Sequence, residues 1–183
     1  KYNDNNDATS TGNNEGFLPI GNSQTYFRGE YDGGGYSISG LTINRPTTQY
    51  VGLFGLALYA NIRNLGVTND NITGNLQVGS LVGLSYTTII DNCSASGSVV
   101  ASTSHTGGLV GYSYYATIRN SYSTASVDVG SGNYIGGLVG YASDNSTILN
   151  SYSIGSVVTS STTRGGLVGY ADNSTTITDS FYD

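Results

Sequence analysis

Tyrosine is the residue type best placed to do chemistry in this sequence, because it is abundant and recurs at fixed positions. The chain has 16 Tyr and no Trp. A phenol ring offers an apolar face for stacking on a sugar and a hydroxyl for hydrogen bonding, so the recurring rings are candidate ligand contacts. The interpretation that we prefer is that rings of successive repeats stabilise one another as a ladder. The recurring aromatic positions are Tyr112, Tyr141 and Tyr170 in one set, and Tyr122, Tyr152 and Phe181 in another.

Residues for acid–base or nucleophilic catalysis are few. His105 is the only histidine, and its Ser- and Thr-rich surroundings predict a surface loop rather than a catalytic triad. Cys93 is the only cysteine, so no internal disulfide is possible, and its alignment with Ser121 and Ser151 favours a small buried residue. The carboxylates are scattered among turns, whereas glycoside hydrolysis needs two at a defined separation. We therefore expect no enzymatic activity and no cofactor.

Two further kinds of site have candidate residues. Glu30 and Asp32 precede a run of three glycines, which we interpret as a tight turn, with calcium binding as the alternative because calcium takes oxygen ligands. A second oxygen-rich stretch, residues 3–7, lacks the spacing of an EF-hand loop. The candidate glycosylation sites, each opening an Asn-X-Ser/Thr sequon, are Asn71, Asn145 and Asn173.

The elements that position these residues recur along the chain. A Gly-Leu-Val-Gly run and its looser copies place a Gly or Ser before a Leu at positions 52, 80, 108, 137 and 166, so the steps are 28, 28, 29 and 29 residues. A period this regular is typical of a solenoid. After each run comes a second recurring element, with Ile at 62, 90, 118, 148 and 177, and then a third short β-branched run.

The sequence therefore predicts an all-β fold, a parallel β-solenoid of about five to six rungs, where a rung is one turn of about 28–29 residues with three short strands. The recurring Leu and Ile should form columns in the core, because a single rung cannot bury its own apolar face. A column of Asn at 64, 92, 120 and 150 should mark a corner, where stacked amides bond from rung to rung. Strand alternation from an inward Leu predicts an outward Val and an outward Tyr.

Three regions follow from the pattern. Residues 1–16 are polar and predict a tail or linker. Residues 17–50 are expected to form an atypical opening or capping rung, and residues 51–183 to form the regular repeats. In the opening rung, Ile38 should align with Ile62 and Ile43 with Val67. The chain starts at Lys1 without any Met, and its last rung lacks a third strand, so we expect a processed chain or a fragment whose open end pairs with another β segment.

The repeats also resemble a known family. Gly107-Gly-Leu-Val-Gly-Tyr112 followed by Thr117-Ile-Arg-Asn-Ser-Tyr-Ser123 is similar to the GLUG repeat of bacterial extracellular proteins. The resemblance extends over about residues 17–183, and it implies a surface-exposed or secreted β-helical region of the kind found in adhesin-like proteins and beside peptidase domains. The family motif carries no catalytic residues, so none is transferred to this chain.

Composition narrows the function further. The formal net charge is −6 with only 6 Lys and Arg, which argues against nucleic acid as a partner, and no stretch approaches a membrane span. We expect an extracellular, non-catalytic structural or adhesive module, a stalk or filament subunit that assembles end to end. The alternative is a module that binds a glycan or a host protein through the exposed Tyr columns. Ice binding by the aligned Thr117, Thr147 and Thr176, or stabilisation by calcium, is a minor alternative.

Overall fold

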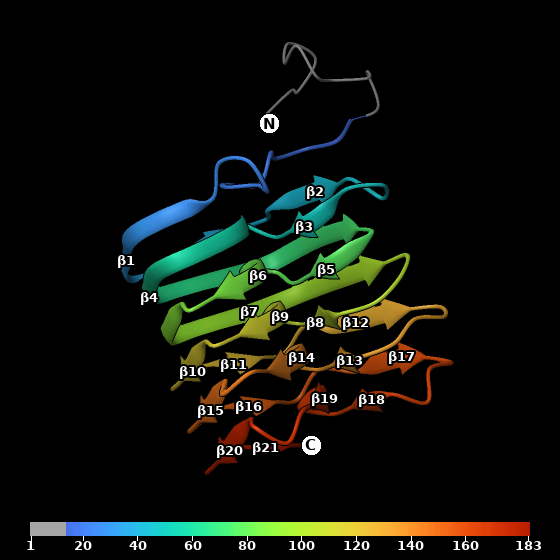
Figure 1. Cartoon of the computed structure of the whole chain (residues 1–183). Coiled ribbons are helices and arrows are strands. Elements are labelled where there is room, and N and C mark those ends of the chain that lie inside the picture. Colours follow the sequence, from blue (N-terminus) through green and yellow to red (C-terminus); the bar gives the residue numbers. More distant parts are fainter. Residues whose placement is uncertain (1–13) are drawn as a thin grey trace.

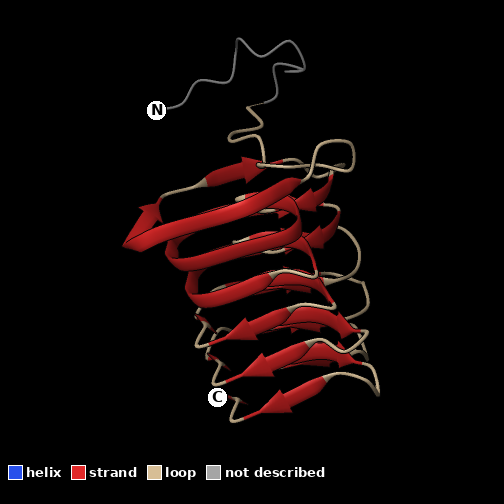
Figure 2. Ribbon diagram, turned by 60° about the vertical axis from the view of Figure 1, so that its left-hand side comes forward, coloured by secondary structure: helices blue, strands red, loops and turns tan. Residues whose placement is uncertain are grey.

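The chain winds into a stack of parallel strands (Figure 1). The structure is a computed structural model that describes residues 14–183, so residues 1–13 of the predicted tail at 1–16, with the oxygen-rich stretch at 3–7, lie outside the described residues. Successive rungs lie in register with loops at the edges (Figure 2), and every pairing between named strands is parallel. The predicted β-solenoid is therefore confirmed.

The strands fall into four columns, because each rung contains the three predicted runs and a short additional one. β4 (Phe54–Gly74) and β7 (Ile89–Ala101) are long enough to run through more than one column. The column that follows each Gly-Leu pair contains part of β4, β6 (Val82–Tyr86), β9 (Val110–Tyr114), β14 (Val139–Ser143) and β19 (Val168–Ala171).

The second column contains the recurring Ile, and the third the β-branched runs. The second comprises β1 (Phe27–Ser39), the middle of β4, the start of β7, β10 (Thr117–Arg119), β11 (Tyr122–Ser123), β15 (Thr147–Leu149), β16 (Tyr152–Ser153), β20 (Thr176–Thr178) and β21 (Phe181–Tyr182). The third comprises β2 (Thr42–Asn44), the ends of β4 and β7, β12 (Ser126–Val129) and β17 (Val157–Thr159). The additional column is a separate five-stranded sheet of β3 (Gln49–Val51), β5 (Leu76–Val78), β8 (Thr106–Gly107), β13 (Ile135–Gly136) and β18 (Arg164–Gly165).

The core consists of the predicted apolar columns. Ile62, Ile90, Ile118 and Ile148 are fully buried, and the recurring Leu residues at 53, 81, 109, 138 and 167 are all buried as well. Each of these side chains stacks on its equivalent in the next rung, because the strands pair residue for residue. Burial of apolar area across rungs, rather than within one, therefore holds the stack together.

The predicted Asn corner is present. Asn64, Asn92, Asn120 and Asn150 all have positive φ, between 47° and 55°, a conformation that Asn tolerates better than most residues. The amide nitrogen of Asn92 donates to Asn64 Oδ1 at 2.8 Å, and that of Asn150 donates to Asn120 Oδ1 at 3.5 Å. The amide column thus turns the backbone and links neighbouring rungs at the same time.

The opening rung differs from its predicted alignment. Ile38 pairs with Val67 and Ile43 with Ile72, so the predicted register is wrong by five residues. The reason is that Tyr31, rather than Ile38, pairs with Ile62, and the irregularity between Asp32 and Tyr36 then brings Ile38 opposite Val67. Contacts of this rung begin at Glu15, which forms a 2.6 Å ion pair with Arg45. Within residues 14–183 no helix is long and apolar enough to cross a bilayer.

Candidate functional site

The first aromatic ladder lies on the column that follows each Gly-Leu pair, and it comprises Tyr112, Tyr141 and Tyr170. The three residues are in register on β9, β14 and β19. The rings of Tyr112 and Tyr141 are 4.8 Å apart and nearly parallel, at 7°, whereas Tyr141 and Tyr170 are 5.5 Å apart and tilted by 58°. Tyr112 and Tyr141 are half-buried, and Tyr170 is 44% exposed. The predicted column is therefore present, with its rings stacked on one another.

One orientation predicted for this column is wrong. Val82, Val110 and Val139 follow the buried Leu residues and are themselves fully buried, although simple alternation places them outside. The chain bends at each Gly-Leu pair, and the strand begins only at the Val, so the alternation starts afresh there. Both the Leu and the Val therefore contribute to the core.

His105 belongs to the same aromatic cluster, which corrects its predicted place in a plain surface loop. Its ring stacks on Tyr112 at 5.3 Å, on Tyr134 at 5.2 Å and on Tyr141 at 5.4 Å. Its Nδ1 is buried with no hydrogen-bond partner among residues 14–183, and burial lowers the pKa of the imidazole. Burial therefore favours the neutral form of the ring, which packs among the tyrosines.

The sequence signal for this arrangement is the period itself. His105 and Tyr134 are 29 residues apart, and each stands two residues before a Gly-Gly pair. Both have positive φ, at 58° and 64°, as do Tyr50 and Gln77 in the preceding rungs. The left-handed conformation turns these side chains onto the neighbouring Tyr ladder, which strand alternation alone does not predict.

The second aromatic ladder comprises Tyr122, Tyr152 and Phe181. Their rings are 4.9 Å and 5.4 Å apart, with interplanar angles of 3° and 8°. Tyr122 is 38% and Phe181 59% exposed, while Tyr152 is half-buried between them. In such a stack each inner ring has both faces covered by its neighbours, so a planar ligand can stack only on an end ring. This geometry favours the ladder interpretation over sugar stacking along the whole column.

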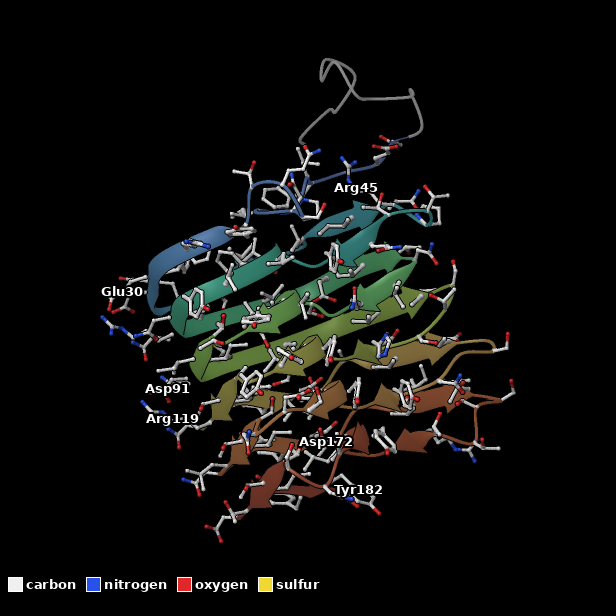
Figure 3. The ribbon with its side chains drawn as sticks, in the orientation of Figure 1. Glu30, Arg45, Asp91, Arg119, Asp172 and Tyr182 are labelled. Carbon is white, nitrogen blue, oxygen red and sulfur yellow. The ribbon has the colours of Figure 1, made fainter. Side chains whose placement is uncertain are left out.

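The carboxylates proposed for calcium are held by nearby cations and amides. Asp32 accepts hydrogen bonds from the Asn64 amide at 3.0 Å, the Gly34 N–H at 2.9 Å and Arg63 Nε at 3.0 Å. These bonds, that of Asn64 above all, lower the pKa of Asp32 to about 2. Glu30 lies 3.9 Å from Arg63, along the same edge of the stack as Asp91 and Arg119 (Figure 3). No cluster of three His, Cys, Asp or Glu able to hold a metal occurs in residues 14–183.

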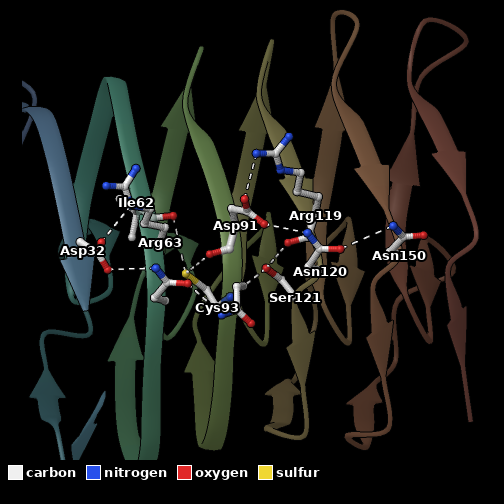
Figure 4. A network of polar contacts seen from close by, with 11 residues as sticks. Asp32, Ile62, Arg63, Asp91, Cys93, Arg119, Asn120, Ser121 and Asn150 are labelled. Atoms are coloured by element: carbon white, nitrogen blue, oxygen red, sulfur yellow. Dashed lines mark hydrogen bonds and ion pairs between the residues drawn. The ribbon is translucent and has the colours of Figure 1, made fainter. Parts of the chain in front are cut away.

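Cys93 lies inside the corner, next to Ser121 (Figure 4). Its N–H donates to Ser121 Oγ at 3.1 Å, and the Ser121 N–H donates in turn to Ser151 Oγ at 3.2 Å. The thiol is buried, and burial raises its pKa to about 11. The prediction of a small buried residue is confirmed, and a thiol with this pKa is a poor nucleophile.

The remaining candidates lie on the surface. Asn71, Asn145 and Asn173 are all exposed, as a glycosylation acceptor must be. Thr117, Thr147 and Thr176 are in register on β10, β15 and β20. Their neighbours two positions along are Arg119, Leu149 and Thr178, so the column has a single regular Thr row.

A family model matches three consecutive segments of the solenoid. The model of the GLUG motif matches residues 74–100, 102–128 and 131–158. These three segments are GLUG motifs. The resemblance found in the sequence is thereby confirmed.

Two curated relatives and one solved structure are similar to this chain. Halomucin of Haloquadratum walsbyi is 40% identical over 107 residues, which cover 57% of this chain and 1% of that protein. A protein named "Putative Gly-rich membrane protein" of Evansella cellulosilytica is 42% identical over 83 residues, covering 43% of this chain and 10% of the relative. The crystal structure titled as a putative immunoglobulin A1 protease from Bacteroides ovatus has a TM-score of 0.60 at 25% identity, covering 81% of this chain and 49% of that one.

The matched chain spans only a small part of these relatives, less than half in each case. The three GLUG motifs show that the chain is a repeat protein. The aromatic ladders are not common to all three GLUG motifs, however. The first motif has Leu84 and Ser94 at the positions that Tyr112 and Tyr122 occupy in the second.

Proposed function

We propose that this chain is a non-catalytic structural module of an extracellular or cell-surface protein, a β-solenoid segment of a stalk. The observation that carries the proposal is the continuity of the columns from rung to rung. Backbone pairing, the Asn corner and both aromatic ladders each connect one rung to the next. A structure of this kind lengthens by about 4.8 Å for each added rung without changing its cross-section.

The composition supports secretion. Only 10% of residues are charged, so Ser, Thr, Asn and Gly must supply most of the polar surface. The exposed sequons at Asn71, Asn145 and Asn173 are compatible with glycosylation in a host that performs it. The surroundings of His105 support a non-catalytic role, since three tyrosine rings pack around the imidazole.

We further propose that the last described rung is covered by another β rung, supplied either by continuing sequence or by another copy of the chain. Ile177 is 40% exposed, whereas its equivalent Ile148 in the preceding rung is fully buried. Phe181 and Tyr182 are 59% and 66% exposed. An uncovered edge with apolar side chains favours pairing with a further strand.

Pairing at the open edge can be tested by removing one backbone N–H that points toward the covering rung. Thr176 N–H donates to Ser146 O and Thr178 O accepts from Asn150 N–H, so the N–H of Ile177, between them, points away from the preceding rung. Ile177→Pro removes that donor, and Ile177→Thr keeps it as the matched control.

The measurement is negative-stain electron microscopy and light scattering over a concentration series. If copies pair end to end, the unmodified chain and Ile177→Thr form particles that lengthen with concentration, and Ile177→Pro does not. Particles of single-chain mass at every concentration would contradict self-assembly and leave continuing sequence as the source of the covering rung.

A second candidate function is binding of a glycan or host protein by the first ladder. Tyr170, Tyr59 and Tyr115 are between 44% and 61% exposed, and they lie in or beside this column. Ligand contact there would use ring edges and hydroxyls, because neighbouring rings cover the faces. Combined replacement of Tyr112, Tyr141 and Tyr170 by Ser would then abolish ligand retention but leave end-to-end assembly intact.

A further inference from the structure

The column that contains the second ladder changes from small residues to aromatic rings half-way along the solenoid. The residues in register, from the first rung to the last, are Ser37, Gly66, Ser94, Tyr122, Tyr152 and Phe181. Three small residues are therefore followed by three rings. The ladder stops at Tyr122, whose only ring neighbour within the described residues is Tyr152.

A hollow lies where the next ring of the ladder would be. It has a volume of about 230 Å³, and Ser37, Gly66, Ser94, Asn92 and Tyr122 are among its lining residues. This volume is below the range of about 300–1,000 Å³ typical of pockets for drug-sized ligands, so it suits a single ring. Tyr122 is 38% exposed, as expected for a stacked ring with one face uncovered.

The rim of the hollow is polar and carries no net charge. Ser37 Oγ, Ser94 Oγ and Asn92 Oδ1 have no hydrogen-bond partner within residues 14–183, although the Asn92 amide nitrogen donates to Asn64 at 2.8 Å. Two carboxylates on this edge, Asp32 and Asp91, are paired with Arg63 at 3.0 Å and with Arg119 at 2.8 Å. A fitting ligand therefore has one apolar face, hydroxyl groups around its edge and no charge.

We propose that this hollow binds one pyranose unit of a neutral glycan, stacked on the free face of Tyr122. A pyranose presents C–H groups on one face and hydroxyls around its rim. The C–H groups are attracted to the electron-rich face of the phenol ring, and the hydroxyls reach the serine and asparagine oxygens. The sugar takes the place of the missing fourth ring, about 4.8 Å from Tyr122. The site is independent of the stalk role, because the columns continue past it unchanged.

The chain offers two variants that change the site in opposite ways. Tyr122→Ser removes the stacking face. Ser94→Tyr places a ring in register with Tyr122, so it extends the ladder and fills the hollow from within. Ser94→Tyr separates loss of binding from loss of folding. Its longer stack should raise the melting temperature, so lost binding in this variant would not come from unfolding. Tyr26→Ser is the control, since it removes a ring that is 37% exposed, close to the 38% of Tyr122, and that belongs to neither ladder.

The experiment is an NMR titration of the isotope-labelled chain with neutral disaccharides of glucose, galactose, mannose and N-acetylglucosamine. A single stacked ring predicts dissociation constants in the millimolar range for at least one sugar, with shifts confined to Tyr122, Ser94 and Asn92. Tyr122→Ser should weaken binding by about tenfold or more, Ser94→Tyr should abolish it, and Tyr26→Ser should leave it unchanged.

Three results would overturn the proposal. The first is the absence of shifts at these residues with every sugar up to about 20 mM, well above the expected dissociation constants. The second is binding by Ser94→Tyr equal to that of the unmodified chain. The third is a response to N-acetyltyrosinamide without any response to the sugars, which would assign the hollow to an aromatic side chain of a partner.

Discussion

Asp70 carries a carboxylate into the interior of the solenoid, with only 4% of its surface exposed. Its Oδ1 accepts a hydrogen bond from the Ser98 N–H at 3.2 Å, and burial raises the pKa of the carboxyl from 3.8 to about 6. A carboxyl whose pKa is raised on folding favours the folded state when protonated. That contribution is complete below the unfolded pKa, near pH 4, and is lost as the pH rises through about 6.

Asp70→Asn should therefore stabilise the protein at neutral pH, because the neutral amide avoids burial of a charge. The shift of about two pKa units corresponds to about 3 kcal/mol at pH 7. The measurement is the melting temperature from pH 4 to pH 8: it should fall over this range in the parent and be much flatter in the variant. The exposed Asp128→Asn is the control. Parallel curves for parent and Asp70→Asn would show that the buried carboxylate does not set the pH dependence.

At the scale of single residues, the sequence predicted which residues line up between rungs better than it predicted where their side chains point. The spacing of the repeats placed Tyr112 on Tyr141, and both aromatic columns exist as expected. It did not place His105 beside them, because the left-handed backbone at that residue depends on the whole turn. Nor did it indicate that Tyr122 ends its ladder over a hollow, which follows from the register between rungs rather than from any one rung.

Among the elements, the strand that follows each Gly-Leu pair approaches the backbone of the additional sheet very closely. A Cβ at Gly140 would lie 2.4 Å from the Thr106 nitrogen and 2.6 Å from the Gly111 oxygen, both in the main chain. The second Gly of the motif is therefore required because two backbones meet there, and no side-chain rearrangement can make room.

Gly140→Ala should destabilise the solenoid by about 2 kcal/mol or more, since overpacking against main-chain atoms cannot relax. Gly130→Ala is a matched control, because a Cβ at Gly130 meets nothing within 4 Å. Its effect should stay within about 0.5 kcal/mol. Urea unfolding followed by circular dichroism measures both. Equal midpoints for the two variants would mean that the close approach at Gly140 does not constrain the fold.

Sequence periodicity predicted the recurring elements well and the opening element poorly. In the regular rungs the apolar columns repeat without insertion, so the pairing of Ile90, Ile118 and Ile148 follows directly. In β1 the glycine-rich stretch after Asp32 adds residues that have no equivalent elsewhere, and the register shifts. A single sequence contains no second copy of that stretch against which the irregularity can be recognised.

For the whole molecule, one rung should be removable without loss of the fold. Residues 108–136 make one period of 29 residues, and their deletion joins Gly107 to Gly137 within an unchanged Gly-Gly-Leu-Val-Gly-Tyr run. Each rung contacts only its neighbours, so the shortened chain should fold with a lower melting temperature. Deletion of residues 108–121 breaks the register and should abolish cooperative unfolding. Circular dichroism melting measures both, and an unfolded 29-residue deletion would contradict a modular stack.

The architecture as a whole was the most predictable property of this chain, and the binding properties the least. Five in-register copies specify a parallel stack, because no other arrangement buries every Leu and Ile column at once. What the surface contacts depends on individual positions, such as Ser94 in one rung where Tyr122 stands in the next. Such single-residue differences between rungs cannot be predicted from the period of the repeat.

The two described ends of the stack lie at opposite ends of the axis, and each rung is bonded only to its neighbours (Figure 1). Tension applied between residues 14 and 183 therefore loads the outermost rungs first. Each rung that detaches releases about 95 Å of chain, from 28 residues at about 3.4 Å each, while the rungs behind it stay folded. Each remaining rung is a template on which the slack chain can wind again, so the molecule yields to a pull in steps and recovers when the load is removed.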